Sequence, residues 1–118
     1  MIYIKKFESK NSLCVSKIII SNLLKYNSKD YPLEAINTLI KFYSPDDIIN
    51  YSKNDEIYVA TNLINNEILG TISISNNQVR NVFVKDEYHQ KGIGKKLMNY
   101  IENIAQKRKL PKLFLLAN

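Results

Sequence analysis

The hexad His-Gln-Lys-Gly-Ile-Gly at residues 89–94 carries the clearest chemical signal in the sequence. Gly92 and Gly94 are two of only three glycines among 118 residues, so their close spacing is informative. A β-type run, VRNVFV, precedes the hexad at 79–84, and a helical run, KKLMNYIENIAQKRK, follows it at 95–109. The first N–H groups of a helix lack partners within the helix, and together with the helix dipole they attract anions. The pattern therefore predicts an anion site at a strand-to-helix junction.

Two common phosphate loops do not fit this spacing. A Walker A loop has a glycine five residues before the glycine of its GK pair and a Ser or Thr after the lysine, but His89 and Lys96 occupy those places. A dinucleotide loop, GxGxxG, needs a third glycine where Leu97 stands. The remaining pattern is x-x-G-x-G, and Lys91 and Lys95 would add positive charge at its rim.

The elements that must position this loop follow from the hydrophobic periodicity. The first half of the chain is mostly helical, and the second half changes to the period of strands. The resulting order is β-α-α-β-β-β-α-β, which predicts an α+β fold. We expect a strand at 2–7, a helix capped by Asn11 or Ser12, a helix from Pro32, a short helix after Ser44, strands at 56–63, 67–75 and 78–84, the helix described above, and a last strand at 112–117.

Apolar residues at helical spacing predict the buried faces of the helices. The asparagine pairs 65–66 and 76–77 predict tight hairpins, because asparagine tolerates positive φ. Gly70 interrupts the middle strand and indicates either a bulge, close approach of another backbone, or simple tolerance of a weak strand residue. The predicted helical stripes are Val15, Ile18, Ile19, Leu23 and Tyr26 in the first helix, Leu33, Ile36, Leu39, Ile40 and Tyr43 in the second, and Ile93, Leu97, Ile101, Ile104 and Ala105 in the last.

Composition limits the classes of function. The chain is 45% hydrophobic and 24% charged, as in ordinary globular domains, and no segment approaches the length of a membrane span. We therefore expect a cytoplasmic protein with no membrane partner. Cys14 and His89 are the only residues of their types, which excludes a Cys/His metal site within one chain, and Cys14 is expected in the core. The net charge of +6 favours an anionic partner but does not by itself choose between nucleic acid, a membrane surface and a phosphorylated small molecule.

Placed after a three-stranded meander and before an amphipathic helix, the hexad resembles the acetyl-CoA loop of the GCN5-related N-acetyltransferase (GNAT) superfamily. That loop is usually written (Gln/Arg)-x-x-G-x-(Gly/Ala). His89 stands at its first position, where it can still donate a hydrogen bond, but a surface histidine with no catalytic role is the favoured interpretation. The resemblance is close over residues 56–118 and rests on element order in the first half.

The resemblance implies a GNAT-like mixed sheet in a single domain of residues 1–118. The helical part, about 8–54, would shape the substrate side, and about 56–118 would bind acetyl-CoA as co-substrate. A primary amine of an unidentified acceptor would attack the thioester directly. The implied cofactor-binding residues are the strand backbone at Val82, Phe83 and Val84, the loop residues His89, Gln90, Lys91, Gly92, Ile93, Gly94 and Lys95, and Asn118, which matches an asparagine of many relatives.

The resemblance leaves the catalytic residues unassigned. Gln78 stands where histone-type relatives carry a basic glutamate, and the nearby carboxylates, Glu56, Glu67, Asp86 and Glu87, are not distinguished from one another. Family members continue through another helix and two strands that include a tyrosine acid, whereas this sequence ends at Asn118. We therefore expect either a chain that self-associates as a homo-oligomer through its last strand, 112–117, or a fragment.

Three functions follow from these observations. The first is acetyl transfer to an amine. The second is a truncated or degenerate CoA-binding module without turnover. The third is a small basic nucleic-acid-binding protein, which is disfavoured because the tyrosines and lysines form no recognisable nucleic-acid motif.

Overall fold

The computed structural model describes residues 1–76 and 78–109, and the backbone of residues 114–115. The predicted order of elements is confirmed, with the short third helix present. The helices and strands are β1 (Ile2–Lys6), α1 (Ser12–Lys25), α2 (Leu33–Ile40), α3 (Pro45–Tyr51), β2 (Glu56–Asn62), β3 (Ile68–Ser75), β4 (Gln78–Val84), α4 (Ile93–Lys107) and β5 (Phe114–Leu115).

In the described part of the chain the strands form a five-stranded sheet in the order β1-β2-β3-β4-β5. Each of the first three strands pairs antiparallel with the next, and β5 pairs parallel with β4. Asn66 and Asn76 have φ values of 62° and 58°, which are the left-handed turn conformations expected for them. The antiparallel meander and the mixed α+β fold are therefore confirmed.

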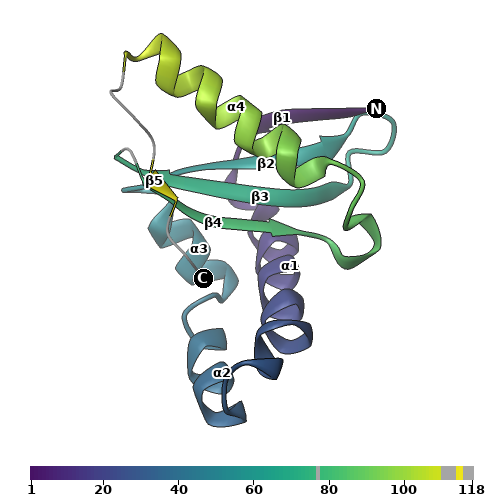
Figure 1. Cartoon of the computed structure of the whole chain (residues 1–118), viewed down its shortest axis with the longest axis vertical. Coiled ribbons are helices and arrows are strands. Elements are labelled where there is room, and N and C mark those ends of the chain that lie inside the picture. Colours follow the sequence, from purple (N-terminus) through teal and green to yellow (C-terminus); the bar gives the residue numbers. More distant parts are fainter. Residues whose placement is uncertain (77, 110–113, 116–118) are drawn as a thin grey trace.

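Helices cover both faces of this sheet (Figure 1). α4 crosses one face, whereas α1 and α3 lie on the other. Since successive strand residues point to opposite faces, β4 contributes side chains to both layers. The core on the α4 side contains Tyr58, Ala60, Leu69, Ile72, Ile74, Val79, Ile93, Leu97 and Ile101. The core on the α1 side contains Phe7, Val15, Ile18, Ile19, Leu23, Ile48, Ile57, Val59 and Ile68, with Phe83 packed against it.

Gly70 lies where α4 packs closely on the sheet. A Cβ atom at this position would lie 3.0 Å from the carbonyl oxygen of Phe83 and 3.3 Å from side-chain atoms of Ile93 and Leu97. The register between β2 and β3 also shifts beside it, leaving Leu69 as an extra residue. The bulge and the close approach considered from the sequence thus occur together. A side chain at this position would push the start of α4 away from the sheet.

One prediction about the helical half is wrong and another holds in part. Cys14 is exposed rather than buried, because α1 turns the face that carries Val15 and Ile18 toward the sheet. In the stripe predicted for the second helix, Ile36 is buried and Ile40 and Tyr43 pack against the core, whereas Leu33 and Leu39 are exposed. The eight residues of α2 lie beyond the sheet at the end of α1 (Figure 1), so the helix has little surface to pack against.

The last predicted strand is described only in part. The backbone of Phe114 and Leu115 pairs with Gln78 and Val79 at the beginning of β4. The rest of the segment 112–117, through which self-association was predicted, lies outside the described residues, as does Asn118. None of the described helices combines the length and hydropathy needed to cross a membrane.

Candidate functional site

The junction between β4 and α4 is the strand-to-helix turn that the flanking runs predicted. Gly92 is the residue before the first turn of α4, with φ 82°, and Gln90 also has a positive φ, 64°. The N–H of Lys96 donates to the carbonyl oxygen of Gly92 at 3.0 Å. Within the described residues, no acceptor is recorded for the N–H groups of residues 90–95. These amides are therefore available to an anion at the N-terminus of a 15-residue helix.

The space around the junction is open on the side of Gly92. A Cβ atom built on Gly92 would have no neighbouring atom within 4 Å, and its φ is one that other residues adopt only with strain. A Cβ atom on Gly94 would make an ordinary contact, 3.9 Å, with the side chain of Val84. The glycine at 92 therefore meets a conformational need, and it also leaves room for a ligand to approach the backbone.

β4 has a free edge next to this junction. β5 pairs with β4 only at Gln78 and Val79, so the later residues of β4 have no strand beside them on that side among the described residues. The N–H of Lys85 donates toward β3, to Leu69. In an antiparallel pair, successive residues direct their backbone N–H and C=O groups alternately toward the partner strand and away from it. Since Lys85 faces β3, Val84 and Val82 direct these groups toward the free edge.

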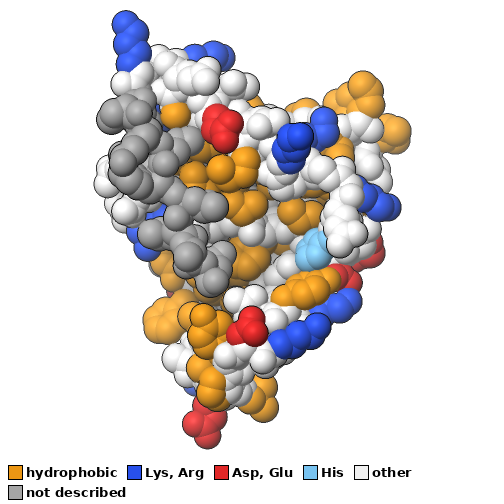
Figure 2. All heavy atoms as spheres, in the orientation of Figure 1, with side chains coloured by type: hydrophobic (Ala, Val, Ile, Leu, Met, Phe, Trp, Pro, Cys, Tyr) orange, Lys and Arg blue, Asp and Glu red, His pale blue; other side chains and the backbone are white. Residues whose placement is uncertain are grey.

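The free edge and the junction line one groove of about 480 Å³. Figure 2 shows this face of the molecule hollowed along the sheet, with hydrophobic side chains exposed in the hollow. The residues that line the groove are Asn22, Val82, Val84, Tyr88, His89, Gln90, Gly92, Ile93, Gly94 and Lys95. Eight of these ten were predicted from the sequence, and the fold brings them together from β4, the loop and α4.

Three predicted residues do not line the groove. Phe83 packs its side chain against the core on the α1 side. Its neighbours Val82 and Val84, rather than Phe83, direct backbone groups toward the free edge. Lys91 holds its Nζ 5.5 Å from the ring centre of Tyr88, outside the groove lining. Asn118 lies outside the described residues.

Asn22 and Tyr88 line the groove but were not predicted. The Asn22 side chain is buried and donates to the carbonyl oxygens of Ile18, at 2.8 Å, and Val84, at 2.9 Å. It therefore joins α1 to the end of β4. A signal was available in the sequence, because Asn22 follows Ile18 and Ile19 at helical spacing and is a polar residue within an apolar stripe. A buried amide at such a position requires partners.

The loop is held against α1 by a second set of contacts. Nε2 of His89 lies 2.7 Å from the carbonyl oxygen of Val84, and its ring centre is 5.0 Å from that of Tyr26. The hydroxyl of Tyr26 donates to Asp86, and Nζ of Lys25 lies 2.6 Å from the same carboxylate. Hydrogen bonds from Lys25 and Tyr26 lower the pKa of Asp86. His89 thus has a structural role in positioning the loop.

The carboxylates considered from the sequence are all paired with basic side chains: Glu56 with Arg108, Glu67 and Glu87 with Lys85, and Asp86 with Lys25. The hydrogen bonds from Arg108 and from Lys85 lower the pKa values of Glu56 and Glu67 respectively. A general base works best with a pKa near the operating pH, so these lowered values are unsuited to that role. The structure therefore favours neither Glu56 nor Glu67 as the base.

Comparison with known proteins identifies the family. The sequence pattern of the acetyltransferase (GNAT) family matches residues 21–118 of the chain. A comparison with curated protein sequences gives no significant match.

Solved structures share the fold at low sequence identity. The PaiA N-acetyltransferase of Thermoplasma acidophilum, solved in complex with coenzyme A, has a TM-score of 0.80 and 22% identity over 93% of this chain and 75% of its own. A GCN5-related N-acetyltransferase of Rhodopseudomonas palustris has a TM-score of 0.86 and 14% identity over 98% of this chain and 72% of its own. A ribosomal-protein-alanine N-acetyltransferase of Brucella melitensis has a TM-score of 0.70 and 17% identity over 100% and 81%. With the family match over residues 21–118, the chain belongs to the GNAT acetyltransferase family.

Proposed function

We propose that this protein transfers an acetyl group from acetyl-CoA to a primary amine by direct attack. The observation that carries the proposal is the continuous groove, in which the free edge of β4 leads to the unpaired amides at the start of α4. CoA has a matching sequence of groups, because its pantetheine arm carries two amides and is followed by a pyrophosphate. The coenzyme A complex of the Thermoplasma relative supports the choice of ligand.

Each part of the groove has a role in this proposal. The N–H groups of residues 90–95 bind the pyrophosphate, helped by the helix dipole and by Lys95. Val82 binds pantetheine through its backbone N–H and C=O, as an added strand would. Val84 contributes only its N–H, because its carbonyl oxygen already accepts from Asn22 and lies 2.7 Å from Nε2 of His89. A backbone N–H of β4 that faces the thioester oxygen stabilises the oxyanion, which lowers the barrier by about 3 kcal/mol.

The reaction is balanced without a further reagent. The amine nitrogen forms a bond to the carbonyl carbon, and the C–S bond of the thioester breaks. The nitrogen loses one proton and the departing thiolate gains one, which gives the acetamide and free CoA. Backbone groups supply the binding and the oxyanion stabilisation, so these parts of the mechanism need no ionised carboxylate.

Calorimetric titration with acetyl-CoA tests the binding site. Gly92→Val should weaken binding at least tenfold, because the new side chain fills the space above the backbone and is strained at φ 82°. Lys91→Ala is the matched control, since this neighbour lies outside the groove lining and should change binding less than threefold. Equal affinities for the parent and Gly92→Val would refute the loop assignment, provided that circular dichroism shows both variants folded.

A CoA-binding module without turnover is a second candidate, and the ion-paired carboxylates favour it. Thiol release from acetyl-CoA, measured over a panel of primary amines, separates the two. Amine-dependent release supports transfer. Binding without release from any amine would replace transfer with the binding module.

The salt dependence of binding tests the nucleic-acid alternative. Affinity for acetyl-CoA should fall only moderately with salt, since most contacts are to fixed backbone amides. Titration with single-stranded RNA should give weak, strongly salt-dependent binding or none. RNA affinity that exceeds acetyl-CoA affinity at physiological salt would contradict the proposal.

A further inference from the structure

A second cavity, of about 180 Å³, lies on the opposite face of the sheet, between β2 to β4 and the helices α1 and α3. This volume is equivalent to roughly six water molecules, so the cavity fits a compact group rather than a macromolecule. It reaches β4 at Arg80 and Asn81, immediately before Val82, where the groove on the other face begins. A ligand in this cavity therefore lies beside the strand that lines the proposed thioester path.

A bulge in β4 supplies the polar end of this cavity. Ser73 pairs with Asn81 and Ile74 pairs with Val79, so Arg80 is an extra residue without a partner in β3. Without the bulge, alternation would place Arg80 and Asn81 on opposite faces of the sheet. Both instead line the cavity. The side-chain amide of Asn81 donates to Oγ of Ser73 at 3.3 Å, which fixes one wall.

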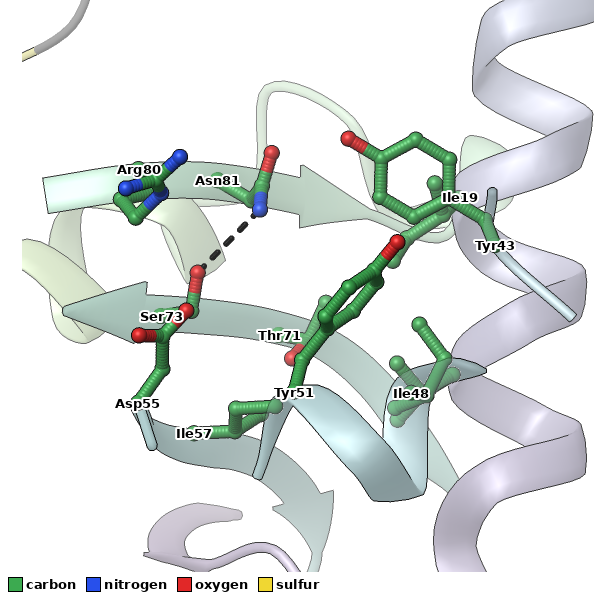
Figure 3. Close-up of a pocket in the computed structure, with 11 residues that line it drawn as sticks. Ile19, Tyr43, Ile48, Tyr51, Asp55, Ile57, Thr71, Ser73, Arg80 and Asn81 are labelled. Atoms are coloured by element: carbon green, nitrogen blue, oxygen red, sulfur yellow. Dashed lines mark hydrogen bonds between the residues drawn. The ribbon is translucent and has the colours of Figure 1, made fainter. Parts of the chain in front are cut away.

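The cavity contains groups of opposite charge. Figure 3 shows Asp55, Ser73, Asn81 and Arg80 at one end. Asp55 is half-buried, and its N–H donates to the carbonyl oxygen of Tyr51 at 2.8 Å, which holds it at the cavity wall. Among the described residues, no salt bridge is recorded for the Asp55 carboxylate or for the Arg80 guanidinium. Two charged groups with no recorded ion pair, beside two hydrogen-bonding side chains, suit a ligand that carries both signs of charge.

The other end of the cavity is apolar. Ile19 and Ile48 lie there, and the rings of Tyr43 and Tyr51 lie between the two ends (Figure 3). The tyrosine rings are 6.3 Å apart in an edge-on arrangement, and the Tyr51 hydroxyl donates to the carbonyl oxygen of Phe42 at 2.7 Å. Burial raises the pKa of Tyr43, and the charge of Arg80 acts in the opposite direction. Arg80 and Tyr43 therefore face the same space.

We propose that this cavity binds the acceptor, and that the acceptor is a small primary amine that also carries an anionic group, a carboxylate or a phosphate. Arg80 binds the anionic group and Asp55 attracts the amine at the polar end of the cavity, and the rings of Tyr43 and Tyr51 contact the hydrocarbon part of the acceptor. Arg80 is the specificity-determining residue because, among the described residues, it is the one that supplies positive charge to the lining. This inference rests on the proposed acetyl transfer.

Matched pairs of amines test the inference and distinguish the two anionic groups. Phosphoethanolamine is compared with ethanolamine, and β-alanine with propylamine, by thiol release from acetyl-CoA. The parent should show a kcat/KM at least tenfold higher for the anionic member of one pair, and that pair identifies the group. Equal rates within both pairs, or faster reaction of both amines that lack the anionic group, would overturn the proposal.

Variants test the residues. Arg80→Gln should remove the preference by slowing only the anionic member, and Arg80→Lys should restore part of it. Equal loss for both members of a pair would mean that Arg80 acts on folding and would contradict its role in specificity. Asp55→Asn should raise KM for both members alike, and an unchanged KM would contradict its role.

Calorimetry with acetyl-CoA separates this inference from the proposed function. Arg80→Gln should bind acetyl-CoA as the parent does, since Arg80 is outside the groove lining. Failure of the parent to bind acetyl-CoA would remove the proposed function itself. Binding and turnover without preference for anionic amines would overturn only the inference about the acceptor.

Discussion

The groove and the cavity lie on opposite sides of β4 and are built from different parts of the chain. The groove takes backbone groups from one continuous segment, from Val82 to Lys95, with Asn22 added from α1. The cavity takes side chains from α1, α3 and three strands, and from the segments between them. Backbone contacts tolerate sequence change, whereas a cavity made of side chains changes with every substitution. The groove therefore suits a shared co-substrate, and the cavity suits selection of one acceptor.

Among the variants that separate the groove from the cavity, Gly70→Val is expected to have the largest effect on stability. The new side chain would collide with the carbonyl oxygen of Phe83 and with Ile93 at the start of α4, so the groove should be disrupted more than the cavity. We expect a loss of about 1–3 kcal/mol in the free energy of unfolding, measured with urea. The control is Gly94→Ala, whose Cβ has an ordinary contact and lies in a helix, where alanine is favoured. Equal stability of the two variants would mean that α4 does not depend on this close approach.

An intermediate effect is expected from Asn22→Ala. The change removes a buried donor to Val84, which loosens the end of β4 and should cost about 1 kcal/mol of stability. Acetyl-CoA affinity should fall a few-fold at the same time, because Val84 lines the groove.

Ser21→Ala is the matched control for Asn22. The Ser21 hydroxyl is exposed and bonds only within the helix, to Ile18, so its removal should change stability by less than about 0.5 kcal/mol. If Asn22→Ala behaves like Ser21→Ala in both measurements, α1 does not support the groove.

The two regions also differ in how far the sequence predicts them. The groove could be predicted because Gly92 adopts a conformation that few residues other than glycine adopt readily, and because a strand and a helix flank it in the sequence. The meander was predictable from the β-type runs and from Asn66 and Asn76. Local signals of this kind act within a few residues, so they remain visible in one sequence.

The cavity could not be predicted, because its residues meet only in the folded chain. Asp55 and Arg80 are 25 positions apart in the numbering, and nothing in either local sequence indicates that they share a cavity. The bulge that brings Arg80 to the cavity lining depends on pairing with β3, which the strand pattern alone does not reveal. The exposure of Cys14 depends on which face of α1 meets the sheet. Periodicity alone does not locate the edge of that face to within one residue.

The smallest effect is expected from the ion pair between Glu56 and Arg108, neither of which lines the groove or the cavity. Arg108 lowers the pKa of Glu56, so the pair stabilises the fold above the unfolded pKa of glutamate, about 4.3, and that stability is lost as the pH falls through the lower folded pKa. Glu56→Gln should therefore cost less than about 1 kcal/mol at pH 7, with the difference from the parent shrinking in acid. A difference that grows below pH 4 would contradict this assignment.

The central claim is that backbone amides of β4 and of the loop before α4 hold acetyl-CoA, and two-dimensional amide NMR during titration tests it most directly. We predict that the largest shifts fall on the amides of residues 90–95 and of Val82 and Val84, and that amides lining only the second cavity, such as that of Ile48, move little. Shifts concentrated on α1 and α3, or an absence of shifts at saturating acetyl-CoA, would contradict the account.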